Sequence, residues 1–132
     1  MENAIRDFIR ISKYAGMRND LAQAGGGNTS VKLDDRVMLV KSSGFQLADV
    51  SENSGYSKID YRLVVEYFQK NVREAGEAAQ GTEVENAFTE ETGKKLLQEA
   101  QMEGGRASIE TFLHAITGKY TLHSHPALVN IL

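Results

Sequence analysis

The sequence predicts a single domain, residues 1–132, that combines α-helices with β-strands, and two kinds of periodicity support this prediction. Apolar residues recur at helical spacing near the N-terminus, within 61–71 and within 108–118. Short runs rich in β-branched and aromatic residues, at 31–40 and 120–122, are typical of strands. A chain of 132 residues is long enough to bury a hydrophobic core.

Composition narrows the classes of function. Hydrophobic residues make up 41% and charged residues 25% of the chain, as in soluble globular proteins. The net charge of −3, without a basic stripe, argues against nucleic-acid binding. The chain has no cysteine, so a metal ion would need histidine and carboxylate ligands. We see no secretory leader and no apolar stretch of membrane-spanning length, and we expect a cytoplasmic protein that does not bind membranes.

Residues Glu2–Tyr14 are expected to form the first helix, which would end near Gly16. Its apolar face is predicted to hold Ile5, Phe8, Ile9 and Tyr14. Next, Val31–Leu33 and Arg36–Val40 flank the turn pair Asp34–Asp35 and predict a β-hairpin.

Two polar, glycine-containing stretches border this hairpin. Residues 25–27 are three glycines, followed by Asn28, Thr29 and Ser30, of which the last two should face opposite sides of a strand. After the second strand comes Lys41–Gly44, with two hydroxyls and a glycine. Each stretch alone fits an ordinary loop or turn, but loops on neighbouring strands can face one pocket and bind an anion there.

The middle of the chain is expected to be mostly helical. Ser57–Asp60 fits a short strand, and Asp60 is a candidate N-cap for a helix over Tyr61–Asn71. That helix should pack inward through Leu63, Val64, Tyr67 and Phe68. Glu74–Glu83 is expected to be exposed, and Val84–Met102 is expected to be helical with an interruption at Gly93.

Ser108 is a good N-cap and Gly118 a good terminator for a helix between them. This helix would place Glu110 in its first turn and leave its N-terminus available to an anion. Ser108 is therefore both a cap and a potential phosphate ligand.

The residues with the clearest chemistry are His123 and His125. In a strand, residues two apart point to the same face, so both imidazoles can reach one Zn²⁺ ion. Chance spacing is the alternative, but all three histidines of the chain fall within residues 110–125. Glu110 and His114 stand four apart, on one face if that stretch is helical.

Four motifs in this order resemble the class II aldolase/adducin family, and most closely its rhamnulose- and fuculose-phosphate aldolases. They span nearly the whole chain: Gly27-Asn28-Thr29-Ser30-Val31-Lys32, Lys41-Ser42-Ser43-Gly44, Ser108-Ile109-Glu110-Thr111 and His123-Ser124-His125-Pro126. The resemblance implies a three-layer α/β/α sandwich around a largely antiparallel sheet, usually assembled as a homo-oligomer, namely a tetramer.

The resemblance also implies a site. His123 and His125 match two of the three histidines that hold Zn²⁺ (or another divalent metal), and Glu110 matches the catalytic acid/base. The phosphate of a sugar-phosphate substrate would lie on Asn28, Ser43, Gly44 and Ser108. His114 would pack beside the site, or, one helical turn from Glu110, substitute as the third metal ligand.

Two departures from the family pattern carry expectations of their own. Ile109 stands where several members have a second serine, which implies weaker phosphate binding or a different substrate. The family's third histidine lies well downstream, so the domain is expected to be truncated at its C-terminus, with weak zinc binding and poor cleavage.

The resemblance thus predicts a metal-dependent aldolase-type lyase that stabilises an enediolate with zinc. A non-catalytic, adducin-like interaction module is one alternative. An epimerase or decarboxylase built on the same chemistry is the other.

Overall fold

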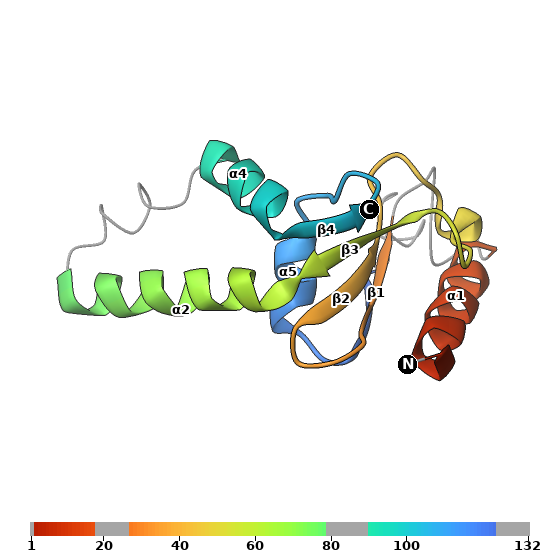
Figure 1. The fold of residues 1–132 in the computed structure, drawn as a ribbon, viewed down its shortest axis with the longest axis horizontal. Coiled ribbons are helices and arrows are strands. Elements are labelled where there is room, and N and C mark those ends of the chain that lie inside the picture. The colour runs from red at the N-terminus through yellow and green to blue at the C-terminus, as the bar shows by residue number, and fades with distance from the viewer. Residues whose placement is uncertain (1, 18–26, 79–89, 124–132) are drawn as a thin grey trace, which may run out of the picture.

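The computed structural model describes residues 2–17, 27–78 and 90–123, which form a five-stranded sheet with helices on both faces (Figure 1). The strands are β1 (Asn28–Lys32), β2 (Val37–Lys41), β3 (Tyr56–Asp60), β4 (Gln101–Gly104) and β5 (Tyr120–His123). Their order in the sheet is β4-β3-β2-β1-β5, and every neighbouring pair is antiparallel. The predicted mixture of helices with a largely antiparallel sheet is confirmed.

The helices lie on opposite faces of the sheet. They are α1 (Glu2–Gly16), α2 (Tyr61–Ala78), α4 (Glu90–Ala100) and α5 (Thr111–Ile116), with a short 3₁₀ turn at Leu47–Asp49. Helix α1 covers one face, and α2, α4 and α5 lie on the other (Figure 1). None of the helices in the described ranges is long and apolar enough to cross a membrane.

Two separate cores follow from the alternation of side chains along β2. Met38 and Val40 point to the face covered by α2, α4 and α5, where they pack with Phe112. Leu39 points to the other face and packs with Phe8 of α1. Residues on both faces of β2 are apolar because both faces are buried.

The first helix forms as predicted, but one of its assigned core residues is wrong. Phe8 is fully buried, and its ring meets that of Tyr56 edge-on, with centroids 6.3 Å apart. Tyr14, which we expected on the apolar face, is 61% exposed. The buried side chains follow the spacing Ala4, Phe8, Ser12 and Ala15. Position 14 lies off this stripe, so its aromatic ring faces away from the sheet.

The predicted hairpin is confirmed, with Val31 opposite Leu39. Its turn is held by Asp34, whose carboxylate accepts hydrogen bonds from the backbone N–H groups of Arg36 and Val37, at 2.8 and 2.6 Å. Strand β1 begins at Asn28, earlier than expected, because residues 28–31 also pair with β5.

The helix after β3 begins at Tyr61, as predicted, and extends further, to Ala78. Val64 is buried, whereas Leu63 is 41% exposed and was wrongly assigned to the core. Asp60 directly precedes this helix, as predicted for an N-cap, but its side chain points elsewhere: one carboxylate oxygen accepts from Arg36 Nε at 2.8 Å, and the other has no partner.

The expected helix over Val84–Met102 is wrong at its end. Helix α4 stops at Ala100, and Gln101–Gly104 forms the edge strand β4, paired with β3. The Gln101 carboxamide donates to the carbonyl oxygens of Gly104 and Gly105, at 3.0 and 2.6 Å, which stabilises the turn that follows. Gly93 is a buried residue inside α4 rather than an interruption. The expectations for Glu74–Glu83 and for residues 84–89 fall on residues or side chains outside the described part.

Gly104 is needed for the end of β4. Its φ is +93°, and a Cβ there would collide with the carbonyl oxygen of Tyr56. We predict that Gly104→Ala lowers the free energy of unfolding by about 2 kcal/mol or more. Gly118→Ala is the control, because nothing lies within 4 Å of a Cβ at that position. Urea denaturation of both variants measures the difference; equal stabilities would contradict the prediction.

Candidate functional site

The ends of β1, β2 and β5 and the segment before α5 meet at one place in the fold. Asn28 lies opposite His123 in the β1–β5 pair. Ser42 forms an antiparallel bridge with Ala107, and the N–H of Ser43 donates to the carbonyl oxygen of Arg106 at 2.7 Å. These contacts join the first sequence motif to the fourth, and they place the second motif beside the segment that leads into the third.

Glu110 and His123 are direct neighbours. A carboxylate oxygen of Glu110 lies 3.5 Å from Nδ1 of His123, and the two side chains are 31% and 35% exposed. A carboxylate beside an imidazole, both reachable from solvent, can exchange protons with a ligand or contribute ligands to a metal ion. His125 lies outside the described residues.

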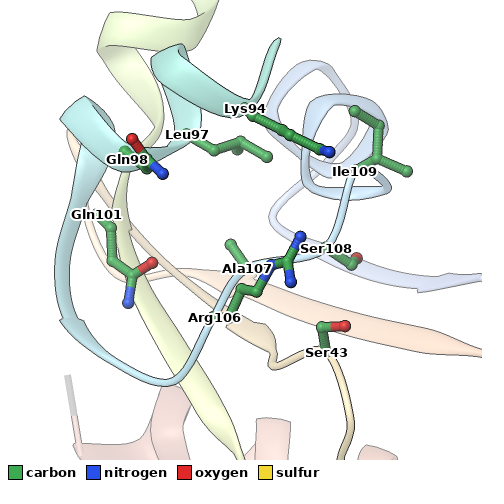
Figure 2. Close-up of a pocket in the computed structure, with 9 residues that line it drawn as sticks. All are labelled: Ser43, Lys94, Leu97, Gln98, Gln101, Arg106, Ala107, Ser108 and Ile109. Atoms are coloured by element: carbon green, nitrogen blue, oxygen red, sulfur yellow. The ribbon is translucent and has the colours of Figure 1, made fainter. Parts of the chain in front are cut away.

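The predicted phosphate-binding residues fall into two groups. Ser43 and Ser108 line a cavity of about 590 Å³ (Figure 2). Asn28 is not among the residues that line this cavity: it is fully buried, and its Nδ2 donates to Oγ of Ser108 at 3.4 Å from the interior of the protein. Gly44 follows Ser43 with φ +88°, a conformation that suits glycine. Their common role in binding phosphate stays a prediction.

The helix expected from Ser108 starts later. Helix α5 begins at Thr111, and Glu110 takes the N-cap position without a side-chain capping bond. The Ser108 backbone carbonyl accepts from the N–H of Thr111 at 3.0 Å, while its hydroxyl accepts from Asn28. Ser108 is therefore not a helix cap, and Glu110 lies before the helix rather than in its first turn. This short turn aims the Glu110 side chain at His123.

His114 is buried beside this pair. Its side chain is fully enclosed, and Nδ1 forms a hydrogen bond of 2.7 Å with Oγ of Ser30. Nε2 has no hydrogen-bond partner, and the ring centre lies 6.4 Å from that of His123. Thr29 faces the opposite side and bonds Ser12 of α1, so the predicted alternation at 29 and 30 is confirmed.

Burial, and to a lesser extent repulsion from nearby His123, lower the pKa of His114 from 6.5 to about 4, while attraction to Glu110 acts in the opposite direction. The unfolded chain therefore binds a proton at this site below pH 6.5, and the folded chain only below about pH 4.

It follows that His114 makes stability depend on pH in a defined window. Its contribution is complete above pH 6.5 and is lost as the pH falls toward 4, by a total on the order of 3 kcal/mol. Denaturation with urea between pH 7.5 and 4, in EDTA, measures this for wild type and His114→Gln. The wild type should lose more stability on acidification; parallel curves would contradict the prediction.

Lys41 is a site residue that sequence reasoning did not select. It is only 6% exposed, and its Nζ donates to the carbonyl oxygen of Phe45 at 2.6 Å. Burial lowers its pKa, and attraction to Glu110 opposes this effect. The available signal in the sequence was a lysine at the end of a strand whose other residues are all apolar. Lysine is almost never fully buried unless it has a partner, so a lysine in a buried strand indicates a specific role.

Glu110 and His123 fit part of a divalent-metal site, since a carboxylate and an imidazole are suitable ligands for zinc. Within the described ranges, no group of three histidine, aspartate or glutamate residues converges in a way that could hold a metal ion.

No protein-family model and no curated protein sequence matches this chain. A solved structure, the N-terminal class II aldolase domain of a conserved protein from Thermoplasma acidophilum, superimposes with a TM-score of 0.70 at 27% identity. The match covers 95% of this chain.

The fold is class II aldolase-like. The expected relationship is thus supported at the level of the domain, and the rhamnulose- or fuculose-phosphate type belongs to the proposal below. The chain spans 56% of the length of the matched structure.

Proposed function

We propose that this protein is an aldolase-type lyase that acts on a sugar phosphate and depends on Zn²⁺ or another divalent metal. The observation that carries the proposal is the contact of 3.5 Å between Glu110 and His123 within a class II aldolase-like fold. The cavity lined by the hydroxyl-bearing Ser43 and Ser108 also includes Ile109, the residue before Glu110, and it supports a phosphorylated substrate. A rhamnulose- or fuculose-type ketose phosphate is the proposed substrate class.

In this proposal the phosphate lies on Asn28, Ser43, Gly44 and Ser108, and His123 and His125 contribute metal ligands. The metal would supply a positive charge that stabilises the enediolate. Cleavage breaks a C–C bond: the hydroxyl group next to that bond loses its proton and becomes the aldehyde carbonyl, and the electron pair stays with the three-carbon fragment. Glu110, as the acid/base, takes up the hydroxyl proton and delivers it to the carbon of that fragment. We also propose that the helices on both faces of the sheet belong to a three-layer α/β/α sandwich.

The test is an aldol-cleavage assay on a panel of ketose 1-phosphates, with and without added Zn²⁺. NMR follows the aldehyde and the triose phosphate that are released. Metal-dependent release of both products supports the proposal. Proton exchange without cleavage would point to an epimerase or decarboxylase instead, and binding without either reaction would point to an interaction module.

We further propose that the protein is a homo-oligomer. Several apolar side chains are exposed around α5, as an interface requires: Leu113 is 44%, Ile116 62% and Leu122 43% exposed. Light scattering coupled to gel filtration should give a mass that is a multiple of 14.6 kDa. A mass of one chain at high concentration would contradict this.

A further inference from the structure

The cavity at Ser43 and Ser108 is larger than one phosphate group requires. Its volume of about 590 Å³ is in the range of small-molecule sites, roughly 300–1,000 Å³. The two serines lie at one side, and the space continues toward α4, where Leu97 forms part of the wall (Figure 2). A substrate that reaches the serines therefore has room for a further group.

The charges around this further space have one sign. Among the nine described residues that line the cavity, Lys94 and Arg106 are cations and none is a carboxylate. Both side chains extend into the space between α4 and residues 106–109 (Figure 2). In the described part of the chain, no carboxylate lies within ion-pair distance of Arg106.

Neighbouring groups favour an oxyanion in this position. Gln98 brings a carboxamide group to the same cavity, and its N–H groups can donate hydrogen bonds. The carboxamide of Gln101, in contrast, already donates to the carbonyl oxygens of Gly104 and Gly105. Ile109 brings an apolar side chain and no hydroxyl. Affinity for an acidic group would therefore come from the cations, and a guanidinium binds carboxylate or phosphate with two parallel hydrogen bonds.

We propose that this cavity binds a second acidic group of the substrate, with Arg106 as its main ligand and Lys94 as added charge. The inference rests on the proposed function for the placement of the first phosphate at Ser43 and Ser108. The substrate would then be a phosphorylated compound that carries a carboxylate or another phosphate.

Calorimetry with three simple probes tests the proposal: inorganic phosphate, phosphoglycolate and pyrophosphate. EDTA is present, so that a metal ion near His123 does not bind the probes. The variants are Arg106→Gln and the matched control Arg62→Gln, which removes an exposed guanidinium on α2 whose ion-pair contacts are 4.0 Å long. Circular dichroism confirms that each variant is folded.

Wild type should bind at least one two-anion probe about tenfold or more tightly than phosphate. This preference should disappear in Arg106→Gln and persist in Arg62→Gln. A preference for phosphoglycolate would identify a carboxylate as the second group, and a preference for pyrophosphate would identify a phosphate.

Equal affinity of wild type for all three probes, or no binding of either two-anion probe, would overturn the inference. The same loss in both variants would also overturn it, because total charge would then explain the result. These outcomes are separate from the cleavage assay. A protein that keeps the preference but cleaves no ketose phosphate contradicts only the proposed function.

Discussion

Replacing Glu110 by glutamine should slow cleavage of the substrate by roughly 10²–10⁴-fold, the range expected when a general acid/base is removed. Glutamine keeps the size of the side chain but cannot carry the proton. Substrate binding should change much less, because phosphate binding is assigned to other residues. Steady-state kinetics with the best ketose phosphate from the panel, at saturating Zn²⁺, gives kcat and KM separately.

Glu103→Gln is the matched control for this experiment. Its carboxylate is on β4, is 76% exposed and lies 4.0 Å from Lys58, a contact of little energetic weight. The control should retain wild-type kcat. If Glu110→Gln also retains it, Glu110 is not the acid/base, and the mechanism must be assigned to another group.

The second large effect concerns the metal. His123→Asn should reduce zinc affinity more than about tenfold, because the lost imidazole is a strong nitrogen ligand while asparagine offers only a weak one. A competition titration against a chromophoric chelator measures the affinity. His114→Gln is the comparison, since His114 is buried and its Nδ1 is already bound to Ser30.

The pattern of the two variants is decisive. Zinc affinity lost in His123→Asn and kept in His114→Gln supports the assignment of ligands. An equal loss in both would make His114 a ligand through Nε2, the ring nitrogen that has no hydrogen-bond partner. Zinc binding unaffected by His123→Asn would contradict the proposed metal site.

Local features of the sequence predicted four of the five described strands, and predicted the buried faces of the helices less well. The hairpin was predictable because Asp34 marks a turn between two apolar runs, and the turn forms through its own side chain. Tyr14 and Leu63 were wrongly assigned to the core because the sequence shows which helix residues are apolar, but not how wide a strip of the helix surface the sheet covers. Strand β4 was missed because residues 101–104 depend on pairing with β3, a contact distant in sequence.

The candidate site was predictable in its motifs but not in its geometry. The histidine at the end of β5 and the polar start of β1 are separate in sequence, and only the register that sets Asn28 opposite His123 brings them together. Ser108 looked like a helix cap, yet its hydroxyl contacts Asn28 instead. The cavity was not predictable, since Lys94 and Arg106 come from segments that meet only in the folded chain.

The most direct test of the proposed chemistry is exchange of a carbon-bound proton with solvent. Dihydroxyacetone phosphate is the three-carbon product that cleavage of a ketose 1-phosphate must release, and an aldolase exchanges a proton next to its carbonyl without any aldehyde present. Proton NMR in D₂O follows this exchange. We predict zinc-dependent exchange with wild type that Glu110→Gln abolishes; no exchange above background at saturating Zn²⁺, or equal exchange by both proteins, would contradict the account.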